Sequence, residues 1–146
     1  MIYPLLPDVD ALVTGALRAG LPGATVRVLW PEQWAGVLPL VVVRRVGGVG
    51  QDARGIDSAI IDVQCAARTR REASLLARRA RVVLAEACAT QYRGVDGYLT
   101  HFADVSGPHE LRTGAPSAGP DLFRFQATYR VICRPFVGRP EQPSSQ

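Results

Sequence analysis

The chain contains no lysine: all 17 of its basic residues are arginine, and 13 acidic residues leave a formal net charge of +4. Such usage suggests a GC-rich genome and says little about function. The arginines are scattered among acidic residues, whereas a dedicated nucleic-acid-binding protein usually concentrates its cations in one patch. The basic charge therefore permits weak attraction to nucleic acid but indicates no binding site.

Long apolar runs are also missing. No stretch approaches the roughly 20 residues that cross a bilayer, although hydrophobic residues make up 47% of the chain. The opening segment, Met1 to Pro7, lacks the basic region of a secretion signal and is interrupted by prolines. We therefore expect a soluble chain with no export signal and no membrane partner.

Cysteine is scarce, and its spacing does not suggest a metal site. Cys65, Cys88 and Cys133 lie far apart within apolar patterns, whereas zinc sites usually show paired spacings such as CxxC. We expect all three to be buried, reduced thiols.

Groups for acid and base catalysis are equally few. The chain has two histidines, His101 in an expected strand and His109 in an expected turn, and neither lies in a recognisable nucleophile motif. Helix capping and solvation of a strand end explain the carboxylate pairs Asp8 with Asp10 and Asp57 with Asp62. We expect no catalytic residue, no metal, no cofactor and no small-molecule substrate.

Hydrophobic periodicity predicts two helices and five strands. The first helix follows the capping residue Asp8 and closes at Gly20. The second runs from Thr69 to about Thr90 and carries a stripe of small residues. Strands are expected over residues 24–30, 38–46, 56–67, 99–105 and 123–134, and the last has the longest alternation.

This order favours the α+β class: a single two-layer domain with a mainly antiparallel sheet of about five strands and two helices packed on one face, in the order α-β-β-β-α-β-β. Strands joined by short connections are expected to be antiparallel. The domain is expected to span residues 1–137, and residues 138–146 to form a disordered tail. The other sheet face would carry polar side chains suited to water or a partner subunit: Asp62, Gln64, Gln126, Thr128 and Arg130.

A glycine cluster follows the second expected strand. The string from Gly48 to Ala53 loosely matches a dinucleotide-binding fingerprint, but that motif must open a helix, and here a strand follows. We therefore predict a flexible hairpin loop from Gly47 to Gly55 that contacts a partner. Its candidate interface residues are Gly47, Gly48, Val49, Gly50, Gln51, Asp52 and Arg54.

Over residues 8 to 134 the chain resembles the tail terminator proteins of long-tailed bacteriophages, also called tail-completion or minor tail proteins. The order and spacing of four strings carry the resemblance, more than any one string alone. They are Asp8-Val9-Asp10-Ala11-Leu12-Val13, Val41-Val42-Val43-Arg44-Arg45-Val46-Gly47-Gly48, Ile61-Asp62-Val63 leading into Arg71-Glu72-Ala73, and Arg124-Phe125-Gln126-Ala127-Thr128-Tyr129-Arg130-Val131.

The resemblance implies a non-enzymatic structural protein of the virion tail, assembled in the cytoplasm of a bacterial host. It implies a homo-oligomer, a hexameric ring, that binds the last ring of the tail tube protein and stops tail growth. The ring would offer a surface to the head-tail connector protein, with DNA only as cargo passing through and no cofactor.

Three other hypotheses stay open. A head-closure or neck subunit of the same particle would also need rings and loops. An enzyme with an unrecognised site would have only two histidines and few carboxylates as catalytic groups. A small basic nucleic-acid-binding domain would lose affinity steeply with salt, and its binding residues would be Arg70, Arg71, Arg78 and Arg79.

Overall fold

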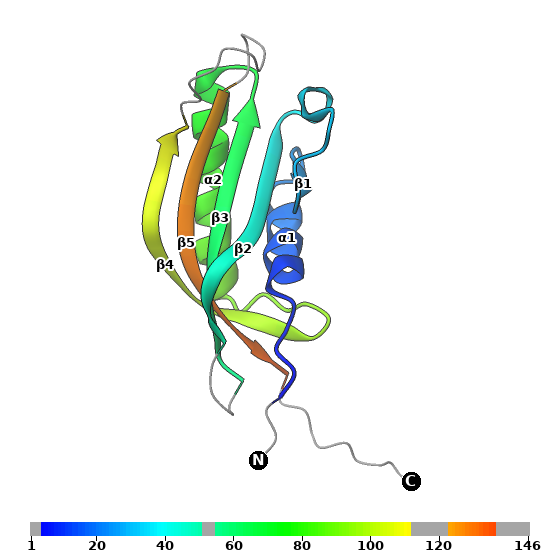
Figure 1. Cartoon of the computed structure of the whole chain (residues 1–146), viewed down its shortest axis with the longest axis vertical. Coiled ribbons are helices and arrows are strands. Elements are labelled where there is room, and N and C mark those ends of the chain that lie inside the picture. The colour runs from blue at the N-terminus through cyan, green and yellow to red at the C-terminus, as the bar shows by residue number, and fades with distance from the viewer. Residues whose placement is uncertain (1–3, 51–54, 112–122, 137–146) are drawn as a thin grey trace.

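Two helices lie behind a five-stranded sheet in a two-layer arrangement (Figure 1). The computed structural model describes residues 4–50, 55–111 and 123–136. The predicted fold class and the predicted order of elements are confirmed. The elements are α1 (Val9–Gly20), β1 (Thr25–Arg27), the 3-10 helix η1 (Trp34–Val37), β2 (Leu40–Gly50), β3 (Asp57–Ala67), α2 (Arg70–Ala89), β4 (Gly97–Glu110) and β5 (Phe123–Pro135).

Both α-helices begin at a capping side chain. The Asp8 carboxylate accepts a hydrogen bond from the Ala11 amide at 3.2 Å, before α1. The Thr69 hydroxyl accepts one from the Glu72 amide at 3.1 Å, before α2. Such caps satisfy amides that the first helical turn leaves free. No helix in the described ranges is both long enough and apolar enough to span a membrane.

The core lies between the helices and one face of the sheet. Residues that alternate along β3 and β5 are buried there, as the period-2 pattern predicted. The small-residue stripe of α2 faces them and lets the helix lie close to the sheet. Its buried members are Ala73, Leu76, Ala77, Ala80, Leu84, Ala87 and Cys88.

Replacing Ala80 by leucine should overpack this contact, because Ala80 is completely buried in the middle of the stripe. We expect a loss of about 1–3 kcal/mol in the free energy of unfolding, measured by urea denaturation. Ala89→Leu is the matched control, since Ala89 is exposed at the end of α2 and should change stability by less than about 0.5 kcal/mol. Equal effects of the two substitutions would mean that the stripe does not pack on the sheet.

The strands lie in the order β1-β2-β3-β5-β4, and every neighbouring pair except β1 and β2 is antiparallel. The expectation that the first two strands are antiparallel is wrong: β1 and β2 are parallel, with Thr25 beside Leu40. β1 ends at Arg27, before its predicted end, and Leu29 is 67% exposed outside the sheet. The twelve residues 28–39 return the chain through η1, as a parallel pairing requires.

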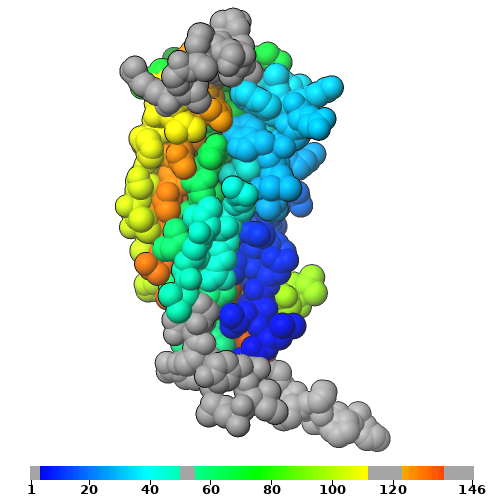
Figure 2. All heavy atoms as spheres, in the orientation of Figure 1, coloured from blue at the N-terminus to red at the C-terminus, as the bar shows by residue number. Residues whose placement is uncertain are grey.

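That connection covers one end of the outer sheet face, the face that carries no α-helix. The rings of Trp30 and Trp34 pack edge to face at 5.1 Å, and the Arg124 guanidinium lies 5.5 Å from the Trp30 ring. In Figure 2 the connection, in light blue, lies at the upper right of this face. It explains why Leu40 and Ala66 are fully buried although both belong to the outer face.

β4 is longer than predicted and continues to Glu110. His109 therefore lies in a strand, and its predicted position in a turn is wrong. Pro108 does not interrupt the strand because β4 is an edge strand, where a missing amide on the outer side needs no partner. The pairing with β5 is irregular there, with register shifts after Asp104 and after Ser106.

Candidate assembly surfaces

The end of the β2–β3 hairpin holds the residues predicted to contact a partner. Residues Gly47–Gly50 belong to β2 and pair with Asp57–Ile60 of β3, so the prediction of a loop beginning at Gly47 is wrong. Glycine weakens a strand but does not prevent it from pairing with a neighbour in register. The other candidates, Gln51, Asp52 and Arg54, lie outside the described residues.

The glycines allow this strand to twist and to approach its neighbour closely, and they do not turn it into a loop. A bulge between Arg45 and Gly47 leaves Val46 as the extra residue of β2, and bulges increase the local twist. Gly48 has a φ of 101°, and a Cβ added there would collide with the carbonyl oxygen of Ser58 on β3. Both the backbone conformation and the space therefore require glycine at position 48.

Two valines near the hairpin end project into solvent. Val46 is 54% exposed and Val49 is 63% exposed. Val49 pairs with Ser58 of β3, and the bulge residue Val46 lies between paired residues of β2, so both are apolar points on the sheet and not parts of an adaptable loop. Their role in contacting a partner stays a prediction.

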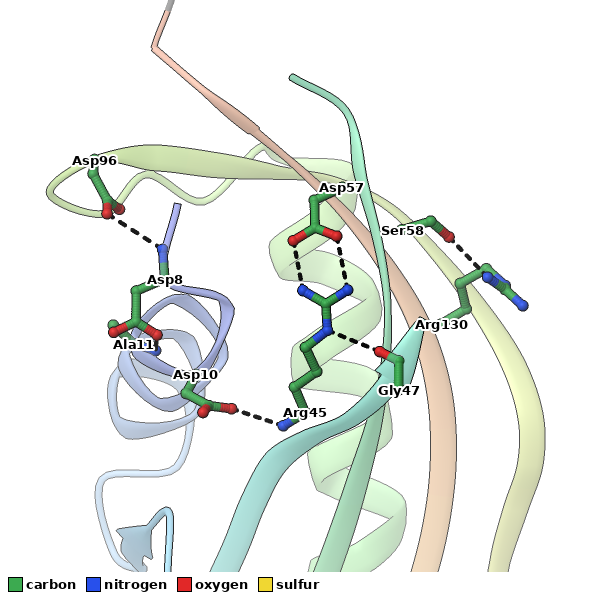
Figure 3. A network of polar contacts seen from close by, with 9 residues as sticks. All are labelled: Asp8, Asp10, Ala11, Arg45, Gly47, Asp57, Ser58, Asp96 and Arg130. Carbon is green, nitrogen blue, oxygen red and sulfur yellow. Dashed lines mark hydrogen bonds and ion pairs between the residues drawn. The ribbon is translucent and has the colours of Figure 1, made fainter. Parts of the chain in front are cut away.

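A polar network fastens this hairpin to the rest of the chain (Figure 3). The Arg45 guanidinium makes two hydrogen bonds, of 2.7 and 2.9 Å, to the Asp57 carboxylate. Its Nε donates to the Gly47 carbonyl at 2.8 Å, and the Arg45 amide donates to the Asp10 carboxylate of α1 at 2.7 Å. Asp57 is 1% exposed, so its expected role in strand-end solvation is wrong: it is the buried partner of an ion pair.

The outer sheet face is polar, as predicted, and its side chains bond to one another. The Asp62 carboxylate accepts from Gln126 at 2.6 Å and from Gln64 at 3.1 Å. Arg130 donates to the Ser58 hydroxyl at 2.8 Å. Figure 2 shows this face from β2 to β4. The amide partners occupy the Asp62 carboxylate, so this face presents a bonded polar surface and not an acid-base pair.

The arginines of α2 partly serve the fold. Arg70 binds Glu110 of β4 at 3.0 Å. Arg81 makes two hydrogen bonds to Asp104 of β4, of 2.8 and 2.6 Å, and its guanidinium lowers the pKa of that exposed carboxyl. These pairs attach the helix to the edge strand, and they give the nucleic-acid hypothesis no separate support.

The described residues do not assemble a catalytic or metal-binding group. His101 and His109 are both exposed on β4 and lie eight positions apart along it. Within residues 4–50, 55–111 and 123–136, no three histidine, cysteine or acidic side chains come together to hold a metal ion.

The cysteines are free and buried, which confirms the prediction for their burial. Burial raises the pKa of Cys65, Cys88 and Cys133 to about 12. For Cys88 a hydrogen bond with the His101 backbone opposes part of that effect. The folded state therefore keeps these thiols protonated and unreactive.

Stability should consequently fall as the pH rises above about 9. The unfolded chain loses its thiol protons near the ordinary pKa of about 8.5, whereas the folded chain holds them up to about 12. A raised pKa in the folded state contributes stability below the unfolded pKa, and this contribution is lost as the pH rises between the two values. The urea midpoint should be lower at pH 10.5 than at pH 8, and less so in Cys65→Ala. A midpoint unchanged by pH would contradict the burial of the thiols.

Most of this chain matches a known protein family. The family described as phage tail termination protein matches residues 5–140, a range that includes every helix and strand described above. The chain belongs to this family. Comparison with curated proteins gives no match.

Membership in the phage tail termination family confirms the resemblance and assigns a broad role. The chain is a structural, non-enzymatic component of the phage tail in the virion. The family implies association with the tail tube.

Two surface features had no strong sequence signal. One is the turn Gly94-Val95-Asp96-Gly97 between α2 and β4, which its paired glycines could have indicated. The other is a groove at the opposite end of α2. Several separate segments of the chain form that groove, so no local pattern could reveal it.

Proposed function

We propose that the protein forms a six-membered ring that binds the last ring of the tail tube and ends its growth. The ring offers its other side to the head-tail connector, and DNA passes through it as cargo. Assembly takes place in the cytoplasm of the bacterial host. The observation that carries this proposal is the family match over residues 5–140.

The structure of the subunit supports this proposal in two ways. A ring subunit must present two different surfaces to its neighbours around the axis, and a two-layer domain has a helical face and a sheet face that differ in chemistry. The end of the β2–β3 hairpin, with Val49 63% exposed, supplies an apolar contact toward a neighbouring ring. In this proposal Gly47–Gly50 and the adjoining Gln51, Asp52 and Arg54 make that contact.

Electron microscopy of purified protein mixed with tail tubes tests the ring. We expect a ring of the protein at one end of each tube and tubes that no longer lengthen when more tube protein is added. Tubes that keep growing at both ends in the presence of excess protein would contradict the proposal.

Val49→Asp tests the hairpin contact. The folded subunit should keep its stability because Val49 is exposed, but a phage with this change should have tails of irregular length or tails not joined to heads. Val105→Asp is the matched control, since Val105 on β4 is 54% exposed and lies away from the hairpin end. Normal tails in both variants would show that the hairpin is not the contact.

A further inference from the structure

Val95 stands at the apex of a tight turn that follows α2. The Gly94 amide donates a hydrogen bond to the Gly97 carbonyl at 2.8 Å, and Val95 between them is 98% exposed. Among the described residues no large hydrophobic side chain is more exposed. Figures 1 and 2 show this segment, in yellow-green, projecting from the lower right of the molecule. The side chain of Val95 contributes nothing to the core of its own subunit.

The turn packs against the residues that precede α1. A Cβ at Gly97 would lie 2.5 Å from Pro7, so the two segments are already in close contact. The Asp96 carboxylate accepts a hydrogen bond from the Asp8 amide at 3.3 Å (Figure 3). An apolar side chain on a fixed backbone loses little entropy when it binds, and such preorganisation favours association.

An apolar groove with a volume of about 640 Å³ lies beside the first half of α2. The turn after α1, the two residues before β2, the end of β3 and α2 form its walls. Its volume falls within the range of sites that bury drug-sized ligands, so it can receive several side chains of a turn. Apolar lining residues are Leu21, Pro22, Leu38, Pro39, Leu75 and Leu76.

The turn and the groove are complementary in polarity and in charge. Val95 matches the apolar lining, in which Leu75 is 37% exposed. The turn also carries one exposed cation, Arg93, and one exposed anion, Asp96. The groove is bordered by one exposed anion, Glu72, and exposed cations that include Arg79. The turn with its flanking Arg93 and the border of the groove thus each carry charges of both signs, which allows attraction between them.

The turn cannot reach the groove of its own subunit. The groove borders the first half of α2, and the turn follows its last residue. α2 has 20 residues, which corresponds to a length of about 30 Å. The contact therefore needs a second copy. A contact between two different surfaces repeats from copy to copy and generates a ring if its rotation closes.

We propose that the Val95 turn of one copy occupies this groove on the next copy. This contact rests on the proposed function, because it forms the interface between neighbouring subunits of the ring. In this contact Glu72 attracts Arg93 and Arg79 attracts Asp96, and these attractions orient the turn in the groove.

Disulfide cross-linking tests the contact directly. In a chain that carries both Val95→Cys and Leu75→Cys, mild oxidation in the presence of purified tail tubes should produce a ladder of covalent oligomers. The natural cysteines are buried and should not react. The control chain carries Val105→Cys and Leu75→Cys; Val105 is also exposed but lies outside the contact, and this chain should give no ladder.

Val95→Ser tests the energetic role of the side chain. Because Val95 is exposed, the subunit should fold with an unchanged melting temperature. Self-association on tail tubes should weaken at least tenfold, as expected when a buried valine contact is removed. Val105→Ser should leave association unchanged.

The outcomes separate this contact from the proposed function. If rings form on tail tubes without the specific cross-link, or if Val95→Ser leaves association unchanged, the proposed contact is wrong. The proposal that the protein forms a ring is then unaffected. A specific cross-link on tubes that stay uncapped supports the contact and overturns tail termination by a ring. If neither rings nor cross-links form in the presence of tubes, both the contact and the proposed function are overturned.

Discussion

Replacing Asp57 by alanine should lower the free energy of unfolding by about 3 kcal/mol, because the ion pair loses its buried partner and the Arg45 that remains is only 30% exposed. Asp57 is 1% exposed and receives two hydrogen bonds from Arg45. Without the carboxylate, the guanidinium keeps only its bond to Gly47 within this network. Chemical denaturation at neutral pH measures the loss.

Asp104→Ala is the matched control for this prediction. Asp104 also receives two hydrogen bonds from one arginine, Arg81, but both side chains are more than 40% exposed. Solvent screens an exposed pair and hydrates the arginine that is left behind, so the loss of stability should be much smaller. Equal losses in the two variants would show that burial does not set the strength of the Arg45–Asp57 pair.

The double variant Arg45→Met and Asp57→Leu separates loss of the pair from loss of packing. Apolar residues of similar size often replace a buried ion pair without a large cost. We expect this variant to be more stable than Asp57→Ala, because no unpaired charge is left in this network.

The parts of the fold predicted correctly are those where one periodicity runs for many residues. In β3 from Asp57 to Cys65 and in β5 from Arg124 to Arg134, buried residues alternate with less buried ones, and a slip of one residue would turn every apolar side chain outward. α2 keeps a helical period over 20 residues between recognisable ends. In these elements local preference and burial point to the same structure, so the sequence alone was sufficient.

The predicted strand direction and strand limits were wrong where pairing with a neighbouring strand determines the structure. β1 has only three residues, and its direction relative to β2 depends on how residues 28–39 return over the sheet. The Gly47–Gly50 segment has poor strand propensity, yet β3 beside it offers a complete row of partners. Pairing between distant residues outweighs local preference in both places, and a pattern read along the chain does not contain that information.

Candidate contact surfaces were harder to predict than the fold. The sequence pointed to the glycine cluster, and the neighbouring Val49 is exposed. It did not point to the groove beside α2, because Leu21, Leu38 and Leu75 meet there only after folding. Each of these leucines resembles an ordinary core residue in its own segment.

Gly48→Ala should be strongly destabilising, whereas Gly47→Ala should be nearly neutral. Gly48 has a φ of 101°, a conformation that costs a residue with a side chain about 1–3 kcal/mol. A Cβ there would also press on the backbone of β3 at Ser58 and Ala59, and the displacement should add about as much again. At Gly47 the Cβ would meet only Ile60, at an ordinary distance of 3.8 Å.

The comparison of these adjacent glycines tests whether the segment is a paired strand. In a flexible loop both alanines would be tolerated, because a loop can adjust its backbone around a new methyl group. In the paired strand only Gly47 has room and an ordinary conformation, so the two melting temperatures should differ by several degrees. Equal melting temperatures would restore the loop interpretation and would remove the rigid base that the proposed contact of Val49 requires.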